Sequence, residues 1–468
     1  MLAFFKINDP YRVLFVFLGL LIAWISGLLS NPLTIPELNW MIIGERLGGG
    51  NILYRDLWTD VAPFSAGVYW ILDSFFGRSQ KAYMILALIL VCLQSIIFNR
   101  ILLKNDSFNQ STYVPAVIYA SLSILSFDFM TLSPQLMATT FLLLALDFVF
   151  THIMARVKQE EKIQYIGFFL IIATLFYFPY FVFLIGFLLV LLIFTGTPVR
   201  RFFLILYGYL LPLALAGIYY WYRDSFGYFR DQFLMMDFFQ NETKLMSPES
   251  MILVAGLPLI FVIFSLIRLF GRTRYTNFQI TLIQVVLLLF IFAALGFWIS
   301  PLKPPHALII FLPYAAFLIS HFFMLIKSKF ISELSFFSFL VLIVLWNFGT
   351  FFQFSPTSKK IDYSNLKVAE SRWDENTRGK KVMVLTSNIN PLRASELASP
   401  FLSWRISRAV FENPGEYKNV ILVYRSIQKE MPDVIIDPHG VMSNFFNKIP
   451  GLKLKYKQAG EYWMLQKE

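Results

Sequence analysis

The sequence is poor in the residues that mark soluble and disulfide-bonded proteins. Only 15% of its 468 residues are charged, and it contains a single cysteine, Cys92, inside an apolar run. One cysteine excludes a disulfide framework and a cysteine-based metal site, and a soluble domain would carry about a quarter charged residues. Hydrophobic residues instead make up 57% of the chain, with 52 phenylalanines. This composition indicates that most of the chain lies in a membrane.

The net charge of +11 does not point to nucleic acid. The basic residues occur mostly in short clusters between apolar runs, whereas nucleic-acid binding needs a basic patch on one folded face. Short basic clusters of this kind are typical of the cytoplasmic loops of membrane proteins. We also expect no cleavable signal, because the apolar segment 11–30 is long enough to remain a span and no small-residue cleavage site follows it.

Apolar runs of about 20 residues, the length that crosses a bilayer, recur through most of the chain. The sequence therefore predicts a mainly α-helical, polytopic membrane protein with about eleven transmembrane helices. The expected spans are 11–30, 81–103, 111–128, 131–153, 163–178, 179–196, 202–222, 250–268, 276–299, 306–326 and 330–353. The fifth and sixth meet at "YFPYF", which is either an external turn or a kink in one helix.

The stretch "NILYRDLWTDVAPFSAGVYWILDSFFG", residues 51–77, sets the topology of everything after it. If 61–76 crossed the membrane, Asp73 would be buried in lipid at a cost of roughly 3 kcal/mol. The apolar residues of this segment form one helical stripe, which suits a helix lying in the membrane interface. They are Phe64, Val68, Ile71, Leu72 and Phe75. We therefore expect a first outer loop, 31–80, that carries interfacial helices.

Charge supports the same topology. With the N-terminus in the cytoplasm and 51–77 outside, every predicted inner loop is basic, as the positive-inside rule requires. The inner basic residues are then Lys6, Arg12, Arg100, Lys104, Arg156, Lys158, Lys162, Arg200, Arg201, Arg272, Arg274, Lys327 and Lys329.

The composition changes after about Phe354. The phrases "KKVMVLTSN", "NVILVYRSI" and "DVIID" predict short buried strands, and "PFLSWRISRAVF" predicts a helix between them. Roughly 110 residues suffice for a small α/β domain. We expect a transmembrane domain at 1–354 and an extracytoplasmic α/β domain at 355–468. No repeat of 20–50 residues is apparent, which disfavours solenoids and inverted-repeat transporters.

Three phrases share a recognisable pattern: "TIPELNWMIIGERLGGGNILYRDLW", "DVAPFSAGVYWILDSFFGRSQKAY" and "PLKPPHALIIFLPYAAFL". An acidic residue opens a helix, a glycine-rich turn leads to Tyr-Arg-Asp, a proline-led amphipathic helix follows, and a late proline-rich loop enters a span. In this the chain resembles the GT-C glycosyltransferases, most closely the aminoarabinose-transferase and protein-mannosyltransferase branch. The resemblance implies an inverting enzyme of the cytoplasmic membrane that moves a sugar from a polyprenyl phosphate to an envelope protein or glycan on its outer face.

Such a transfer is a displacement at the anomeric carbon, so a carboxylate must take or orient the acceptor's proton. The resemblance places Glu37 at the family's first-loop acidic position. The phrase "TIPE", residues 34–37, is also a capping box, and one residue can fill both roles. The helix that begins there carries Leu38, Met41 and Ile42 on one face, which we expect to lie on the membrane.

Three aspartates are further candidates for the chemistry. Asp56 and Asp60 stand four residues apart beside Arg55. They form either a solvated turn with a local ion pair worth under about 1 kcal/mol, or a site for a divalent cation or an acceptor hydroxyl. Asp128, in "LSFDFMTLSPQ", matches the family's second-loop acidic residue, although a lone Asp at a helix end is often a cap. The histidine spacing predicts no metal site.

Cations are needed to hold the departing phosphate. Arg55, Arg78 and Lys81 flank the expected interfacial helix, and Lys303 with His306 lies in the late loop, which two prolines stiffen. Basic residues at an interface can equally anchor to lipid headgroups, and this alternative applies most to Arg78 and Lys81.

One departure from the family pattern leaves the function open. Where the family often has a cation before the amphipathic helix, "DVAPF" has Val61 and Ala62. Either Arg55 or Lys303 substitutes, or the chain is a non-catalytic GT-C-fold scaffold subunit of an envelope assembly. A transporter is the third hypothesis, and Asp147, in the middle of a predicted span, is the residue that would serve it.

Overall fold

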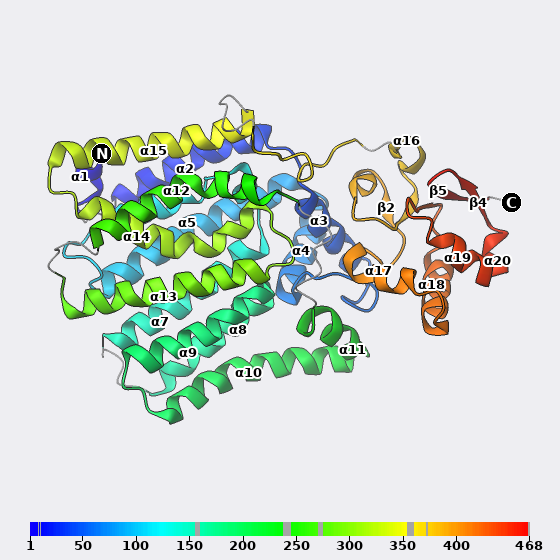
Figure 1. The fold of residues 1–468 in the computed structure, drawn as a ribbon, viewed down its shortest axis with the longest axis horizontal. Helices are drawn as coiled ribbons and strands as arrows, with labels where there is room; N and C mark the ends of the chain where they lie inside the picture. Colours follow the sequence, from blue (N-terminus) through cyan, green and yellow to red (C-terminus); the bar gives the residue numbers. More distant parts are fainter. Residues whose placement is uncertain are drawn as a thin grey trace. The chain divides into compact units, whose positions relative to one another are not determined.

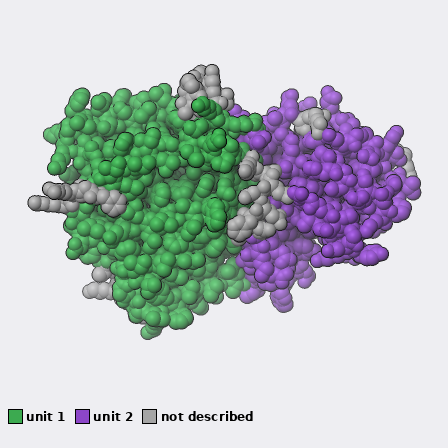
Figure 2. Space-filling view, in the orientation of Figure 1, with its two compact units in different colours: residues 1–31, 80–216, 244–364 green, residues 32–79, 217–243, 365–468 purple. Residues whose placement is uncertain are grey.

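The computed structural model describes the chain except for residues 8, 10, 155–159, 237–244, 270–274, 353–359, 371, 372, 467 and 468. The chain divides into two compact units, which Figure 2 colours separately. Unit 1 comprises residues 1–31, 80–216 and 244–364, and unit 2 comprises residues 32–79, 217–243 and 365–468. The expected domain boundary at 354/355 lies outside the described residues and stays a prediction, as do the inner-loop positions of Arg156, Lys158, Arg272 and Arg274.

Unit 1 is helical (Figure 1). Within the described residues, eight helices are long and apolar enough to cross a membrane. They are α2 (Tyr11–Ser30), α5 (Gln80–Lys104), α7 (Pro134–Ile153), α10 (Val199–Tyr222), α12 (Pro248–Leu269), α13 (Asn277–Ile299), the continuous pair η5 (Pro305–Phe311) and α14 (Leu312–Met324), and α15 (Lys329–Phe352). The chain is a mainly helical, multi-pass membrane protein, as the sequence predicts.

Two expected spans are shorter than a bilayer is thick. Helices α8 (Gln164–Phe176) and α9 (Val182–Phe194) have 13 residues each, or about 20 Å. The 3₁₀ turn η3 (Phe178–Phe181) separates them, so "YFPYF" is a break between two helices. The chain turns at Tyr177, whose backbone is extended, and Pro179 lacks the N–H that would continue the hydrogen bonds of α8.

The expected span 111–128 forms only the nine-residue helix α6 (Val114–Leu122), followed by irregular chain and the 3₁₀ turn η1 (Phe127–Met130). Serines interrupt this stretch, and the hydroxyls of Ser121 and Ser123 bond carbonyl oxygens of the helix itself. Nearly every residue of the segment is buried inside unit 1, which is where non-helical backbone is tolerated in a membrane protein.

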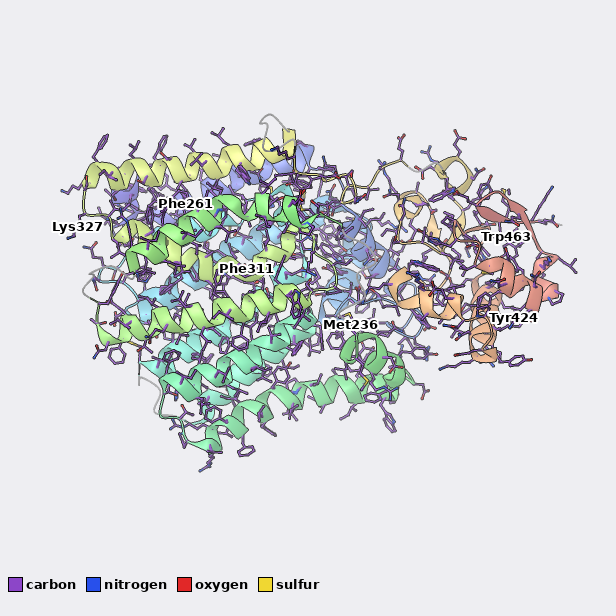
Figure 3. All side chains as sticks on the ribbon, in the orientation of Figure 1. Met236, Phe261, Phe311, Lys327, Tyr424 and Trp463 are labelled. Atoms are coloured by element: carbon purple, nitrogen blue, oxygen red, sulfur yellow. The ribbon has the colours of Figure 1, made fainter. Side chains whose placement is uncertain are left out.

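Small residues let the helices of unit 1 approach closely. A Cβ atom at Gly167 of α8 would lie 1.9 Å from the carbonyl oxygen of Ile205 in α10, so only glycine fits this crossing. Phe261 of α12 and Phe311 of η5 lie among the helices (Figure 3). Apolar side chains such as Leu215 and Ile263 remain more than half exposed, which is typical of a lipid-facing surface.

Unit 2 joins three distant chain segments into one core. The first contributes α3 (Ile35–Gly48) and α4 (Pro63–Phe76), and the second contributes α11 (Phe226–Phe229) and the π-helical turn η4 (Arg230–Leu234). The third is the C-terminal sheet domain. The backbone N–H of Trp58, in the first segment, donates to the carbonyl oxygen of Pro400 at 2.6 Å, and the carbonyl oxygen of Trp58 accepts the backbone N–H of Ser403 at 3.1 Å. Its ring packs into the core of the sheet domain, against Phe401.

The sheet is mixed, with strand order β2-β1-β3-β5-β4. Strands β2 (Glu396–Leu397), β1 (Lys381–Val384) and β3 (Val434–Ile436) are parallel, and β5 (Tyr462–Leu465) and β4 (Tyr456–Ala459) continue it as an antiparallel hairpin. The accompanying helices are α16 (Asp374–Thr377), α17 (Trp404–Glu412), α18 (Tyr417–Glu430), α19 (Met442–Lys448) and α20 (Pro450–Lys453). The strands expected around 381–384 and 434–436 and the helix expected between them are confirmed.

The expected strand "NVILVYRSI" is wrong, because residues 419–427 lie in helix α18. Its buried residues Asn419, Val423 and Ile427 recur every fourth position, which is the period of a helix face. A short apolar run rich in β-branched residues fits either structure, and here the burial of every fourth residue indicates the helix.

Helices α3 and α4 pack closely through Gly44, where a Cβ atom would lie 2.5 Å from Tyr69 O. Leu38, Met41 and Ile42 are buried inside unit 2, so the expectation that they form a membrane-facing surface is wrong. The turn after α3 also explains why the sequence needs glycine there, since Gly50 has a φ of +82°.

The apolar stripe of α4 is divided between two environments. Phe64, Ile71 and Phe75 are 41%, 51% and 78% exposed, while Leu72 is buried. An exposed apolar face on an otherwise packed helix fits the interfacial position that the sequence predicts.

Candidate functional site

Asp128 and His306 come from distant parts of the sequence and are hydrogen-bonded in unit 1. Asp128 lies in η1, and His306 follows the first residue of η5. The carboxylate Oδ2 of Asp128 accepts the backbone N–H of His306 at 2.9 Å and bonds its Nδ1 at 2.8 Å. Their side chains are 0% and 3% exposed. Asp128 therefore caps the first turn of η5, and a carboxylate at Nδ1 fixes the tautomer and the orientation of the ring.

Further polar atoms around this pair are buried without a hydrogen-bond partner among the described residues. They are Ser126 Oγ, Asp128 Oδ1, Thr131 Oγ1, Gln135 Oε1 and Tyr314 OH. Because η1, α7 and α14 all pack against η5, these atoms belong to one end of unit 1. Buried polar atoms in native proteins are nearly always hydrogen-bonded, so this group marks a place for bound water or for a hydroxylated ligand.

A polar network fixes the helices beside this group. Gln94 of α5 donates to Thr140 Oγ1 at 2.7 Å and accepts from Tyr119 OH of α6 at 2.8 Å. Tyr180 OH of η3 lies 2.8 Å from Thr139 Oγ1 of α7. Buried networks whose members are satisfied hold their elements rigidly, so the end of α7 that carries Gln135 has a fixed position.

Two predicted phosphate-binding lysines also belong to unit 1. Lys303 is partly exposed in the loop between α13 and η5, three residues before His306, and Lys81 is exposed in the first turn of α5. Their roles stay predictions.

In unit 2, Glu37 forms the capping box that the sequence predicts. Its Oε2 accepts the backbone N–H of Thr34 at 2.9 Å and the hydroxyl of Thr34 at 3.0 Å, while Thr34 Oγ1 accepts the N–H of Glu37. Glu37 is 2% exposed. The capping interpretation is confirmed, and the catalytic one stays a prediction.

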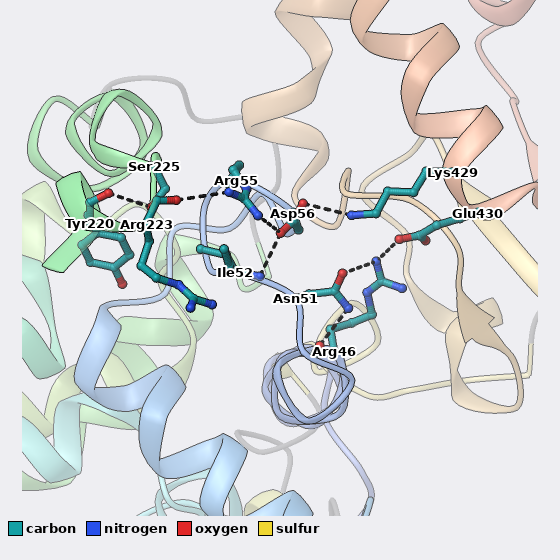
Figure 4. Close-up of polar contacts among 10 residues, drawn as sticks. All are labelled: Arg46, Asn51, Ile52, Arg55, Asp56, Tyr220, Arg223, Ser225, Lys429 and Glu430. Atoms are coloured by element: carbon teal, nitrogen blue, oxygen red, sulfur yellow. Dashed lines mark hydrogen bonds and ion pairs between the residues drawn. The ribbon is translucent and has the colours of Figure 1, made fainter.

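Asp56 and Asp60 each face a cation from the sheet domain. Asp56 bonds Lys429 of α18 at 3.1 Å, Arg55 at 3.2 Å and the Ile52 N–H at 3.0 Å (Figure 4). Asp60 bonds Arg405 of α17 at 3.1 Å. Each aspartate therefore has its own basic partner within unit 2, and a role for either one in binding a divalent cation or an acceptor hydroxyl stays a prediction.

The surroundings of Asp56 keep its carboxylate charged. Burial raises its pKa, but the Ile52 N–H and the charges of Lys429 and Arg55 outweigh this effect and hold the pKa below its usual value. A lowered pKa suits an ion pair and makes Asp56 a weak base.

The predicted cations Arg55 and Arg78 differ in how far they are engaged. Arg78 pairs with Glu45 at 2.6 Å and donates to Leu392 O at 2.7 Å and Ser395 O at 3.2 Å. It fastens the end of α4 to the sheet domain. Arg55 is 36% exposed at its side chain, donates to Arg223 O at 3.1 Å and retains N–H groups for a ligand.

Asp147 has a partner that accounts for its position in α7. Its carboxylate pairs with Lys104, the last residue of α5, at 2.8 Å. An acidic residue paired with a lysine needs no transported ion to balance its charge. Among the described residues, no three His, Cys, Asp or Glu side chains gather as a metal would require.

Sequence reasoning missed the polar residues inside the helices and the basic partners in the sheet domain. Gln94 and Gln135 are signals in retrospect, since an amide within an apolar span is costly unless it is used. Arg405 and Lys429 carried no local signal, because their partners lie more than 340 residues away in the sequence.

Comparisons with known proteins give a distant match. No family model and no curated protein matches the sequence. Among solved structures, the chain is similar to ArnT from Cupriavidus metallidurans, crystallised with undecaprenyl phosphate, at 14% identity and a TM-score of 0.48. The match covers 71% of this chain and 63% of the ArnT chain, so this chain spans less than two thirds of ArnT. ArnT is an aminoarabinose transferase of the branch that the sequence resembles. A likeness of this strength carries no argument about residues or ligands.

Proposed function

We propose that this protein is a GT-C-type glycosyltransferase that moves a sugar from a polyprenyl phosphate to an envelope acceptor. The observation that supports it most is the state of Asp128. One carboxylate oxygen is held by His306, and the other is buried without a partner among the described residues. A rigidly held carboxylate with one uncommitted oxygen, beside unpaired hydroxyl and amide oxygens, is suited to accept a proton from a hydroxyl or amine.

The proposed reaction is a single displacement. The acceptor oxygen or nitrogen bonds to the anomeric carbon of the sugar as the bond from that carbon to the phosphate oxygen breaks, and the electron pair leaves with the phosphate. Asp128 Oδ1 takes the acceptor's proton, while His306 holds the carboxylate in position. Thr131, Gln135 and Tyr314 hydrogen-bond the sugar hydroxyls. The anomeric configuration is inverted because there is one displacement.

The phosphate needs cations outside this acid–base group. We propose two separate candidates for this role, Lys303 in unit 1 and Arg55 in unit 2, since Arg78 is committed to Glu45 and to the sheet domain. The donor lipid we propose is a polyprenyl phosphate, the class of ligand named for the ArnT structure.

The topology we propose has about eleven membrane segments, interfacial helices in 31–80, the N-terminus in the cytoplasm and the sheet domain outside. Single cysteines in a Cys92→Ala background test it in intact cells. An impermeant thiol reagent should label Ser387→Cys in the sheet domain and leave Ser328→Cys, before α15, unlabelled; both positions are exposed. The reverse pattern would invert the topology.

A non-catalytic scaffold of the same fold is the second candidate. It is favoured by the first-loop carboxylates, because Glu37, Asp56 and Asp60 are all engaged in contacts within unit 2.

Turnover separates the two candidates. Purified protein in lipid nanodiscs is incubated with a radiolabelled polyprenyl-phosphate sugar and envelope extract, and sugar transfer is compared with free sugar release. Transfer that is lost in Asp128→Asn supports the enzyme. Tight binding of the donor lipid without transfer, for each of several donor sugars, would support the non-catalytic scaffold.

A further inference from the structure

The backbone at Tyr54 adopts a conformation that tyrosine rarely accepts. Its φ is +69°, in the left-handed region, and a bulky residue there costs on the order of 1–3 kcal/mol. Such strain persists only where the surroundings impose it, and it clusters at functional positions. Tyr54 opens the Tyr-Arg-Asp phrase, so the strained residue is the one that sets the direction of Arg55.

Contacts on every side hold Tyr54 in place. It is fully buried, its N–H donates to Leu57 O at 2.9 Å, and its hydroxyl donates to Val61 O at 2.9 Å. Its ring packs against Tyr220 and Phe229, with centroids 5.4 and 5.8 Å away. Burial raises the pKa of Tyr54 well above its usual value, with Tyr220 and Asp60 raising it further, so the hydroxyl remains a donor.

Gln232 is the residue that joins the two ends of this turn. Its Nε2 donates to Tyr54 O at 2.8 Å, and its Oε1 accepts from Thr59 N–H at 3.3 Å. The side chain is buried, and it projects from the π-helical turn η4. π-Helical turns are rare and are frequent at functional sites. Two uncommon backbone features thus meet through one side-chain amide.

The same chain segment orients the guanidinium of Arg55. Arg55 donates one N–H to Arg223 O at 3.1 Å and another to Asp56 at 3.2 Å (Figure 4). A guanidinium carries five N–H donors in a planar fork, and the remaining ones have no hydrogen-bond partner among the described residues. A fork held on one side and partly exposed on the other is suited to a phosphate.

We infer that Gln232 is a positioning residue for phosphate binding: it locks the strained Tyr54 turn and thereby aims Arg55 at the phosphate of the donor. This rests on the proposed function for the identity of the ligand, and the geometry itself lies wholly within unit 2. Gln232 acts through Arg55 and does not touch the phosphate.

A double-mutant cycle on phosphate affinity tests this inference. The dissociation constant for undecaprenyl phosphate is measured in nanodiscs for the wild type, Gln232→Ala, Arg55→Gln and the double variant. We expect each single variant to weaken binding about tenfold, the scale of one charge-assisted hydrogen bond. The double variant should be no weaker than Arg55→Gln alone, because Gln232 has nothing left to aim. Gln428→Ala, which removes an exposed amide of α18 bonded to Tyr424, is the control and should bind as the wild type does.

Three outcomes would overturn the inference. Additive losses in the double variant would show that Gln232 acts independently of Arg55, in a general structural role. An unchanged affinity in Gln232→Ala would show that Gln232 has no role in phosphate binding. A wild type that does not bind the lipid would exclude the phosphate as the ligand. The proposed function fails separately, if the wild type binds undecaprenyl phosphate and transfers no sugar. Hydrogen exchange of residues 52–60 guards against misfolding, since faster exchange confined to this turn is expected and exchange across the sheet domain would disqualify the variant.

Discussion

The two units hold their acidic residues in opposite ways. In unit 1, Asp128 is buried with one oxygen bonded to His306 and the other uncommitted among the described residues. In unit 2, Asp56 and Asp60 face Lys429 and Arg405 of the sheet domain. A carboxylate paired with a fixed cation can take a proton only by breaking that pair, which makes it a support. A carboxylate with a free buried oxygen can still do chemistry.

Under the proposed function, a cluster of acidic residues in a sequence is a poor guide to the reacting one. Asp56 and Asp60 lie in the part of the chain that most resembles the family, and yet their contacts fasten the first loop to the sheet domain. The solitary Asp128, whose Oδ1 has no hydrogen-bond partner among the described residues, is the one that we propose as the base.

The largest expected effect comes from Asp128→Asn. Removing the base should lower kcat by about 10²- to 10⁴-fold with donor affinity nearly unchanged, because the amide keeps an oxygen for His306. Steady-state transfer and lipid binding measure the two quantities. Asp147→Asn is the matched control, an acidic residue of the same unit paired with Lys104. Equal losses of kcat in Asp128→Asn and Asp147→Asn would contradict the distinction between a reacting and a supporting carboxylate.

Breaking the Asp60–Arg405 pair should act on stability. Both side chains are nearly buried, at 12% and 10% exposed, and removing the carboxylate takes away an opposite charge that Arg405 faces at 3.1 Å. Asp60→Asn should lower the unfolding free energy of the protein by roughly 2 kcal/mol, with kcat retained in the folded fraction. A scanning-fluorescence melt and an activity assay on the same sample separate these readouts. Lost turnover at unchanged stability would make Asp60 a reacting group.

Glu37→Gln compares the two candidate bases directly. Glutamine keeps an oxygen for Thr34, so the cap should lose less than about 1 kcal/mol, and turnover should fall far less than in Asp128→Asn. Both variants are assayed side by side with the same donor. A loss of turnover as large as that of Asp128→Asn would indicate that Glu37 is the base, as the family resemblance implies.

The smallest effect concerns Asp56 and pH. Because its folded pKa is lowered, its stabilising contribution is present above the unfolded value of about 3.9 and is lost as pH falls through the folded pKa. The stability difference between wild type and Asp56→Asn should be about 1 kcal/mol or less at pH 7 and should shrink as the pH falls below the unfolded value. A difference that grows on acidification would contradict the ion-pair assignment.

The helical framework could be predicted because its signals are local. Long apolar runs gave most of the spans, and the "TIPE" phrase gave the capping box of α3, since both depend on neighbouring residues. The irregular stretch after α6 was missed because burial inside the bundle replaces the lipid that a spanning helix requires. The strand expected at 419–427 failed for a related reason, since a run of β-branched residues fits a helix once every fourth side chain is buried.

The candidate site could be predicted from the sequence only in part. Asp128 and His306 could be named from the family pattern, but not their hydrogen bond, because 178 residues separate them. The ion pairs of Asp56 and Asp60 depend on a domain at the other end of the chain. Gln232 was not predicted at all, since nothing in "FRDQFL" indicates a π-helical turn or shows that Gln232 supports a strained tyrosine.

The seating of Trp58 in the core of the sheet domain has a consequence for biosynthesis. Asp60 and Arg405, beside it, are 345 residues apart, and a ribosome needs roughly 20 to 70 s to make that much chain. Throughout that time the first loop has emerged without the surface that buries its tryptophan. During that time α3 and α4 can pack against each other, but Trp58 lacks the core that buries it. Assembly of unit 2 therefore depends on residues 365–468, so a ribosome that stalls before them would leave a protein with inserted helices and an unassembled unit 2.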